Sequence, residues 1–387
     1  MNQIELKAKM LCEGVNVDKK AGELFQKQNP SNVKRGGLGS GGKIQLENGL
    51  FVNVPFYRKR KVDLKIVLDP KRKMGILVQC KGKTIARASV LPAPDWYKET
   101  VSIADYSVYD RESHGAWRGP APEKKIFITN VITAHNKQLA MSVYEDCKLF
   151  SINKQCQFCV MDKSLCKRDK QLVIKKPALI LQALKKIPIE NYGGLTLNGG
   201  MTLKPGRGME LLEPVVREIK KEYPNLPIAV EITPPESLSW INLLVEAGVD
   251  SLMMNLEFWD EDIRQRVIPG KNQYCPRESY LQAFKRANKC FGEKGRVSSC
   301  FIVGIEPIDS LKKGIVEAID HGAIPSLISG RYFEDVPGYS FIPDVDWKVF
   351  LELSEFVINE LHKRGLGSCD KAGCVACKMC DLIKDLV

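Results

Sequence analysis

Seven of the thirteen cysteines in this chain of 387 residues fall into two tight groups that could bind metal. Clustered cysteines in a reduced compartment bind metal or carry out redox chemistry more often than they form disulfides. The other isolated cysteines are expected to be small buried side chains. The two groups are Cys147, Cys156 and Cys159, followed closely by Cys166, and then Cys369, Cys374, Cys377 and Cys380.

The first group follows a predicted strand and has the spacing Cys-x8-Cys-x2-Cys. Three thiolates can hold three irons of a [4Fe–4S] cluster and leave the fourth iron open to a ligand. A structural zinc site would need a fourth ligand, for which Cys166 is available. The pair Cys156 and Cys159 alone could be a redox dithiol. We take Cys147 rather than Cys166 as the third ligand because it stands where the strand should end.

The second group, Cys369-x4-Cys374-x2-Cys377-x2-Cys380, places four thiols within twelve residues. Its successive x2 spacings are typical of ferredoxin-type ligation of an iron–sulfur cluster. A structural zinc site is the alternative. The sequence therefore predicts a second metal site close to the C-terminus.

Short apolar runs alternate with helical patterns six times after about residue 140, which predicts an α/β fold with a parallel sheet. Six units fit a (βα)6 partial TIM barrel better than a closed barrel of eight. Functional residues should then lie on the loops that follow the strands. The runs are 140–146, 194–200, 228–235, 251–257, 297–306 and 324–330, with helices expected in 176–186, 207–224, 235–247, 259–293, 309–322 and 346–365.

The first third of the chain differs from the rest in charge. Residues 1–139 contain 25 of the 58 Lys and Arg residues but 13 of the 46 Asp and Glu residues, which accounts for the whole net charge of +12. Together with short β-branched runs, this predicts a basic, β-rich module over 1–139, a barrel over 140–345 and a C-terminal helix and cysteine segment over 346–387. Basic surface, such as the run 58–61, attracts anionic macromolecules or simply keeps the protein soluble.

The barrel region resembles the radical S-adenosylmethionine (radical SAM) superfamily. The pair Cys156-Gln157-Phe158-Cys159 matches the family's final Cys-x-aromatic-Cys, although most members have three residues, not eight, in the first gap. The resemblance implies a (βα)6 partial barrel with a cluster loop after the first strand. It also implies that these further residues contact SAM: Gly199 and Gly200 after the second strand, Glu231 after the third, Glu257 after the fourth, Gly304 and Glu306 on the fifth, and Arg264, with Arg266 and Lys271 nearby.

Within the superfamily, the sequence pattern of this region most resembles the branch of biotin synthase and lipoyl synthase. The resemblance implies reductive cleavage of SAM to a 5′-deoxyadenosyl radical that activates a C–H bond, with two [4Fe–4S] clusters and SAM as cofactors. Sulfur insertion from the second cluster is the leading finer hypothesis. An electron donor such as ferredoxin or flavodoxin, and an acidic carrier protein docked on the basic module, are the expected partners.

Two other classes of function stay open. One is an RNA-modifying or rearrangement enzyme of the same superfamily, for which exposed aromatic rings among the basic strands would be diagnostic; the candidates are Phe56, Tyr57, Trp96 and Tyr97. The other is a non-enzymatic iron–sulfur or zinc protein that binds nucleic acid. No segment has the 18 consecutive apolar residues of a membrane span, and no apolar run follows the N-terminal charge, so we expect a cytoplasmic location without membrane partners.

Overall fold

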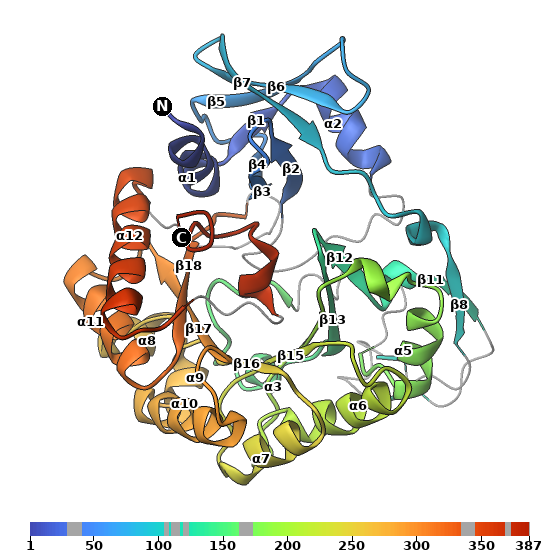
Figure 1. Cartoon of the computed structure of the whole chain (residues 1–387), viewed down its shortest axis with the longest axis vertical. Coiled ribbons are helices and arrows are strands. Elements are labelled where there is room, and N and C mark those ends of the chain that lie inside the picture. The colour runs from blue at the N-terminus through green and yellow to red at the C-terminus, as the bar shows by residue number, and fades with distance from the viewer. Residues whose placement is uncertain are drawn as a thin grey trace.

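The computed structural model describes residues 1–28, 41–103, 108–109, 117–118, 124–161, 173–333, 345–367 and 373–386. Two seven-stranded sheets organise these residues. The first belongs to the N-terminal module and the second forms the core of the barrel. In Figure 1 the module lies at the top and the barrel, with its helices outside, forms the lower arc.

The barrel sheet contains six parallel strands in chain order, which confirms the predicted fold class. The side chains of these strands that face the helices are buried and apolar, which accounts for the short apolar runs in the sequence. A short strand, β12 (Thr133–His135), pairs antiparallel with the first of them at the edge. The six strands are β13 (Gln138–Tyr144), β14 (Leu195–Gly199), β15 (Ile228–Glu231), β16 (Ser251–Met253), β17 (Val297–Val303) and β18 (Ile324–Ser329).

The helices lie within or next to the stretches predicted for them. They follow the curled sheet on its outer side (Figure 1). Their apolar faces are buried against the strands, as expected of amphipathic helices in an α/β fold. They are α5 (Pro177–Leu184), α6 (Met209–Glu222), α7 (Ser239–Glu246), α8 (Glu261–Val267), α9 (Pro269–Tyr274), α10 (Arg277–Phe291), α11 (Ile308–Asp320) and α12 (Trp347–Lys363).

The strand register separates the two faces of the barrel sheet. Leu197, Val230 and Leu252 are paired neighbours, and they are fully buried on the helix side. Side chains alternate along a strand, so the residues next to them point to the inside of the curl. Paired neighbours on that inner face form a mostly polar row, which Met253 interrupts. Its polar members are Ser142, Asn198, Glu231 and Ser298, and the pair of Cys300 and Ser326 lies two residues further along the last two strands.

The N-terminal module combines the predicted strands with two helices that we did not predict. α1 (Gln3–Glu13) begins with a capping box between Asn2 and Glu5, and α2 (Lys19–Lys27) begins at Asp18. The sheet order is β3-β2-β7-β6-β5-β1-β4. Its strands are β1 (Val15–Val17), β2 (Gly42–Leu46), β3 (Phe51–Val54), β4 (Phe56–Tyr57), β5 (Leu64–Leu68), β6 (Gly75–Cys80) and β7 (Lys83–Val90).

Two small antiparallel pairs link the module to the barrel. β8 (Thr100–Ile103) pairs with β11 (Lys124–Phe127), and β9 (Val108–Tyr109) pairs with β10 (Trp117–Arg118). The barrel sheet already includes β12 and the first two residues of β13, before the boundary drawn at residue 140. Within the described residues, no helix is both long enough and apolar enough to span a bilayer.

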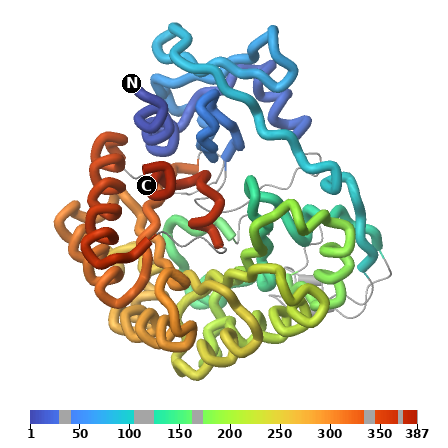
Figure 2. Tube along the Cα trace, in the orientation of Figure 1, coloured from blue at the N-terminus to red at the C-terminus, as the bar shows by residue number. Residues whose placement is uncertain are grey.

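The C-terminal cysteine segment lies between the two sheets (Figure 2). It contains the short 3-10 helix η4 (Cys374–Cys377). Asn136, beside the β12 edge, donates to the backbone oxygen of Cys377, and Ser326 of β18 donates to Asp381. The segment therefore bridges the two edges of the open barrel. A Cβ atom on Gly373 would lie 3.3 Å from the Cβ of Ala229, so the segment also reaches the inner face.

Candidate functional site

The first cysteine group lies where strand β13 gives way to a loop, as predicted. Cys147 is the N-cap of the short helix α3 (Lys148–Ser151). Cys156 and Cys159 form one turn, in which the Cys159 amide donates to the Cys156 carbonyl at 3.1 Å. The backbone amide of Gln157 donates a hydrogen bond to Val267 O, at the end of α8, at 2.8 Å. Cys166, the rival ligand, lies outside the described residues.

Burial controls the electrostatics of these three thiols. It raises the pKa of Cys147, it raises that of Cys156 well above its usual range, and it raises that of Cys159 to about 12. The ammonium of Lys271 opposes this increase at all three cysteines. The thiols also raise one another's pKa, so the three side chains share one neighbourhood. Thiolate ligands must lose these protons when metal binds.

Glu257 and Lys271 form a buried ion pair beside these thiols. Lys271 Nζ lies 2.6 Å from Glu257 Oε1, and the two side chains are 16% and 7% exposed. Burial disfavours the charge on Lys271, but Glu257, Tyr280 and Cys156 together outweigh burial and raise the Lys271 pKa well above its usual range. Among the described residues nothing donates to Glu257 Oε2, although that oxygen is buried. A buried carboxylate oxygen that accepts no hydrogen bond suits a ligand that carries hydroxyl or ammonium donors.

The backbone of Glu257 is strained, with φ of 69° in the left-handed region. Its amide donates to Cys300 O at 2.9 Å, and its carbonyl accepts from the Ile302 amide at 3.0 Å. Strand β17 thus fixes this residue by two hydrogen bonds. Such strain in a non-glycine residue is concentrated at functional sites.

The predicted Gly-Gly turn packs tightly against the cysteine loop. A Cβ atom on Gly200 would lie 1.9 Å from Asp146 O and 2.8 Å from the Cα of Cys147. A Cβ on Gly199 would meet Tyr144 at 3.2 Å, which is a milder contact. In the structure, the close backbone approach that requires Gly200 is to the protein chain itself. Contact of either glycine with SAM stays a prediction.

Arg264 is fully buried and donates to four protein acceptors. These bonds occupy four of the five N–H groups of a guanidinium. The structure therefore gives Arg264 the role of fastening the loop after β16 to helices α8 and α9. The acceptors are Leu256 O at 2.8 Å, Phe258 O at 3.2 Å, Asn272 Oδ1 at 3.0 Å and Cys275 O at 3.0 Å.

Gly304 and Glu306 lie at the end of β17 beside a cavity of about 420 Å³. Gly304 has φ of 101°, a conformation that favours glycine. Glu306 accepts from the amides of Trp259 and Asp260 at 3.0 and 2.9 Å, while burial raises its pKa. Asp346, just before α12, also lines the cavity. The end of the fifth barrel strand therefore borders a space that could hold a ligand, while contact of Gly304 and Glu306 with SAM stays a prediction.

The inner face of the barrel joins Glu231, an expected contact of SAM, to polar residues that the sequence did not single out. The Asn255 amide donates to Glu231 Oε1 at 2.8 Å, and the Cys300 amide donates to Asn255 Oδ1 at 3.0 Å. Ser142 donates to Asn198 at 2.6 Å on the neighbouring strands. Cys300 was expected to be an ordinary buried cysteine, and it is half-buried on this face. Cys300 pairs with Ser326 on the neighbouring strand, and Ser326 donates to Asp381 of the C-terminal segment. This connection is visible only once the register of the sheet is known.

The described part of the second cysteine group lies on η4 and just after it. A hydrogen bond between Cys374 and Cys377 raises the pKa of the former and lowers that of the latter. Cys380 follows, with its thiol pKa raised by burial. Cys369, the predicted fourth ligand, lies outside the described residues. Three of the four predicted ligands are thus near one another, between the module and the inner face of the barrel.

The thiol donors of both groups are ligands that suit iron–sulfur clusters and structural zinc alike. Within the described residues, no three His, Cys, Asp or Glu side chains are close enough together to hold a single metal ion.

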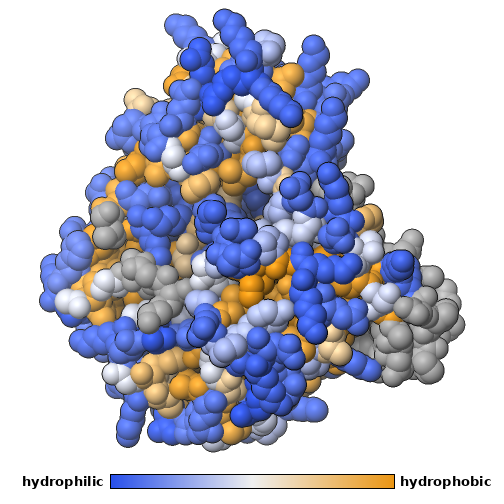
Figure 3. Space-filling model, turned by 45° about the vertical axis from the view of Figure 1, so that its right-hand side comes forward, coloured by the Kyte–Doolittle hydropathy of each residue, from blue (hydrophilic) through white to orange (hydrophobic). Residues whose placement is uncertain are grey.

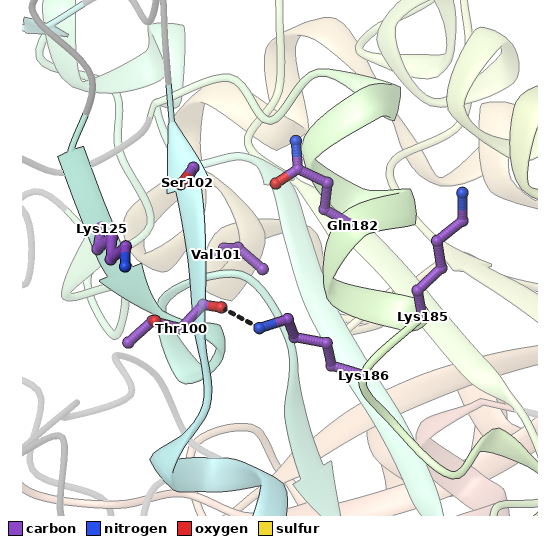
Figure 4. Close-up of a pocket in the computed structure, with 7 residues that line it drawn as sticks. All are labelled: Thr100, Val101, Ser102, Lys125, Gln182, Lys185 and Lys186. Atoms are coloured by element: carbon purple, nitrogen blue, oxygen red, sulfur yellow. Dashed lines mark hydrogen bonds between the residues drawn. The ribbon is translucent and has the colours of Figure 1, made fainter.

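Basic side chains are spread over the module and its link to the barrel. Figure 3 shows hydrophilic side chains over much of the upper part of the molecule. A pocket of about 360 Å³ lies between β8, β11 and α5, and Lys125, Lys185 and Lys186 line it (Figure 4). Lys186 Nζ donates to Thr100 O at 2.8 Å across this pocket.

The aromatic residues proposed as stacking platforms for RNA pack largely inside the protein. Tyr57, Trp96 and Tyr97 are buried. Phe56 is half-buried and meets Phe25 edge to face, with ring centroids 4.7 Å apart. None of these four rings offers the open face that base stacking requires.

Comparisons with known proteins give distant similarities. No family model matches the chain. Over 177 residues it is 27% identical to the bacteriochlorophyllide c C-7(1)-hydroxylase of Chlorobaculum limnaeum, a match that covers 43% of this chain and 42% of the relative. The match thus spans less than half the length of that curated relative.

Among solved structures, the chain resembles a radical SAM methyltransferase from Sphaerobacter thermophilus, with 15% identity, a TM-score of 0.44 and coverage of 70% of this chain and 72% of that one. It also resembles methylornithine synthase (PylB), with 15% identity, a TM-score of 0.45 and coverage of 60% and 64%.

Proposed function

We propose that this chain is a radical SAM enzyme that activates a C–H bond of a substrate held inside the barrel. The observation that carries the proposal is the convergence of Cys147, Cys156 and Cys159 with the Glu257–Lys271 pair after two strands of a six-stranded partial barrel. The sequence similarity to an enzyme named as a hydroxylase gives independent support for C–H chemistry.

A reduced [4Fe–4S] cluster, when bound, supplies the electron that splits SAM into methionine and a 5′-deoxyadenosyl radical. The three cysteines would hold the cluster and leave one iron for SAM. Lys271 would offset the negative charge of the thiolates. Glu257 Oε2 offers a buried acceptor for a hydroxyl or ammonium group of the cofactor. Gly304 and Glu306 border the cavity that could take its adenosine end.

The substrate would lie along the polar inner face of the barrel. Glu231, Asn255 and Cys300 are joined by hydrogen bonds there, and Glu231 and Cys300 are only half-buried. This face lies between the first cysteine group, after the strands, and the C-terminal group, which enters between the barrel edges. A closed space excludes water and competing quenchers from a radical reaction.

Detection of 5′-deoxyadenosine tests the proposal. Anaerobically reconstituted protein with dithionite and SAM should form it, and Cys156→Ala and Cys159→Ala variants should not. The matched variants Cys374→Ala and Cys377→Ala should still cleave SAM but form no product. Absence of 5′-deoxyadenosine from protein with a full complement of iron would reject the proposal and favour the non-enzymatic alternative.

The second cysteine group supports a further [4Fe–4S] cluster, with sulfur insertion as the finer hypothesis. That hypothesis is supported by the position of the group beside the inner face of the barrel. If the cluster is consumed, each chain should make about one product and then stop, and labelled sulfide should appear in that product. The hydroxylase relative favours a competing outcome, in which turnover continues, no label is transferred and oxygen is found at the activated carbon.

The basic module supports docking of an anionic macromolecule, and we propose an acidic carrier protein. The run 58–61 is exposed on the module. Replacement of Arg58, Lys59, Arg60 and Lys61 by Gln should weaken binding of the carrier and flatten its salt dependence. A variant with Lys285, Lys289, Lys294 and Lys313 replaced by Gln serves as the matched control, because it removes the same charge from the barrel. Equal binding by both variants would contradict docking at the module.

An electron donor such as ferredoxin or flavodoxin would supply the reducing electron in the cell.

A further inference from the structure

The N-terminal module holds the backbone of the C-terminal cysteine segment directly. The amide of Asn53, on β3, donates to Met379 O at 2.9 Å. Lys7 Nζ, from α1, donates to Lys378 O at 2.7 Å and pairs with Asp385. Lys7 is fully buried. These contacts fix the turn between Cys377 and Cys380 from a part of the chain that is more than 300 residues away in sequence.

One contact reaches a ligand sulfur itself. Asn53 Nδ2 lies 3.4 Å from Cys380 Sγ, within hydrogen-bonding distance for sulfur, and Asn53 is only 1% exposed. The buried guanidinium of Arg331, after β18, donates to Asn53 O at 2.8 Å. A buried N–H donor therefore reaches this sulfur, and a buried guanidinium holds the backbone of the residue that carries the donor.

We infer that the N-terminal module sets the reduction potential of the C-terminal iron–sulfur site, and that Asn53 is the positioning residue through which it does so. This inference rests on the proposed function, because it requires iron at the C-terminal cysteines. A hydrogen bond to a ligand sulfur stabilises the more negative, reduced state of a cluster and so raises its reduction potential. A nearby cation has the same effect. The module thereby has a role within the site, whether or not it also docks a partner.

Potentiometric titration of the C-terminal cluster tests this role. The background is Cys156→Ala/Cys159→Ala, which removes the barrel cluster, so that the remaining signal belongs to the C-terminal site. Asn53→Leu should lower the midpoint potential, because the donor to Cys380 is lost. At the wild-type midpoint, the ratio of reduced to oxidised cluster should fall by about tenfold, the effect expected for one hydrogen bond to a charged group.

Asn16→Leu is the matched control. Asn16 is in the same module, but its amide donates to Tyr57 O and Arg60 O, away from the cysteines. This variant should keep the wild-type potential. If Asn53→Leu fails to retain iron, Asn53→Ser gives the same measurement, because its side chain is smaller and too short to reach Cys380.

Two results would overturn the inference. One is an unchanged midpoint potential in the Asn53 variants with full C-terminal iron. The other is a C-terminal site that takes no iron in the wild type, which would also remove the second cluster from the proposed function. Cleavage of SAM is measured separately, so failure of the radical SAM proposal itself would be distinguished from either result.

Discussion

Lys271 Nζ lies 2.6 Å from Glu257 Oε1, and this buried pair connects helix α9 to the loop after β16 beside the first cysteine group. Both residues were picked out from the sequence as candidate contacts of the cofactor. Their pairing was not predicted, because they are fourteen residues apart and α8 lies between them. The pair places one cation next to three thiols whose pKa values are raised by burial.

Loss of Lys271 should leave Glu257 as an uncompensated buried charge. We expect Lys271→Met to lower the free energy of unfolding of the metal-free protein by about 3–5 kcal/mol. The double variant Lys271→Met/Glu257→Gln should recover much of that loss, because no charge then remains. Urea unfolding of the single and double variants measures the coupling. Strict additivity of the two single effects would contradict the ion pair.

The positive φ of Glu257 makes a second prediction possible. In the Lys271→Met background, Glu257→Gly should be more stable than Glu257→Ala by roughly 1 kcal/mol, because only Gly adopts the left-handed region without strain. Glu231 is the matched control, since it ends a regular strand. There the Gly variant should be the less stable of the two. Urea unfolding of the four variants decides the matter, and the same order at both positions would contradict the strain.

The architecture of the barrel was largely accessible from the sequence, and the reasons are local. Buried parallel strands such as β17 read as apolar runs, and the helices between them carry amphipathic patterns. The helix α1 was missed, although Asn2 and Glu5 form a recognisable capping box. That signal was present, but the β-branched runs that follow dominated the interpretation of the module.

The contacts between distant segments could not be predicted. Cys300 carries no motif, and only the strand register places it beside Ser326, which binds Asp381 of the C-terminal segment. Arg264 was expected to hold a ligand because of its position after the fourth strand. In the structure it donates to three backbone carbonyls and to Asn272, and a single sequence gives no indication of which acceptors converge on an arginine. Asn53 near Cys380 is the same kind of tertiary contact.

Cys275 makes stability depend on pH in the alkaline range. Burial raises its thiol pKa to about 11, above the value of about 8.5 for an unfolded cysteine. The folded state therefore keeps this proton while the unfolded state releases it. The stabilisation is complete below about pH 8.5 and is lost as the pH rises toward 11, by about 3 kcal/mol in total. Denaturant unfolding at several pH values should show Cys275→Ala losing less stability over this interval than the wild type; equal slopes would contradict the raised pKa.

The close approach of Gly200 to the cysteine loop yields the last prediction. A methyl group on Gly200 would lie 1.9 Å from Asp146 O, and a backbone atom cannot rotate away as a flexible side chain can. Gly200→Ala should therefore displace the loop and Cys147, the first ligand. We expect the variant to lose most of the iron at the first cysteine group and to keep the C-terminal iron.

Gly199→Ala is the matched control, because its methyl group would meet Tyr144 at 3.2 Å, so a shift of a few tenths of an ångström suffices. Iron analysis in the Cys374→Ala/Cys377→Ala background isolates the first site. If Gly200→Ala retains as much iron there as Gly199→Ala, then either Cys147 is not a ligand or the loop moves without cost, and Cys166 becomes the better candidate.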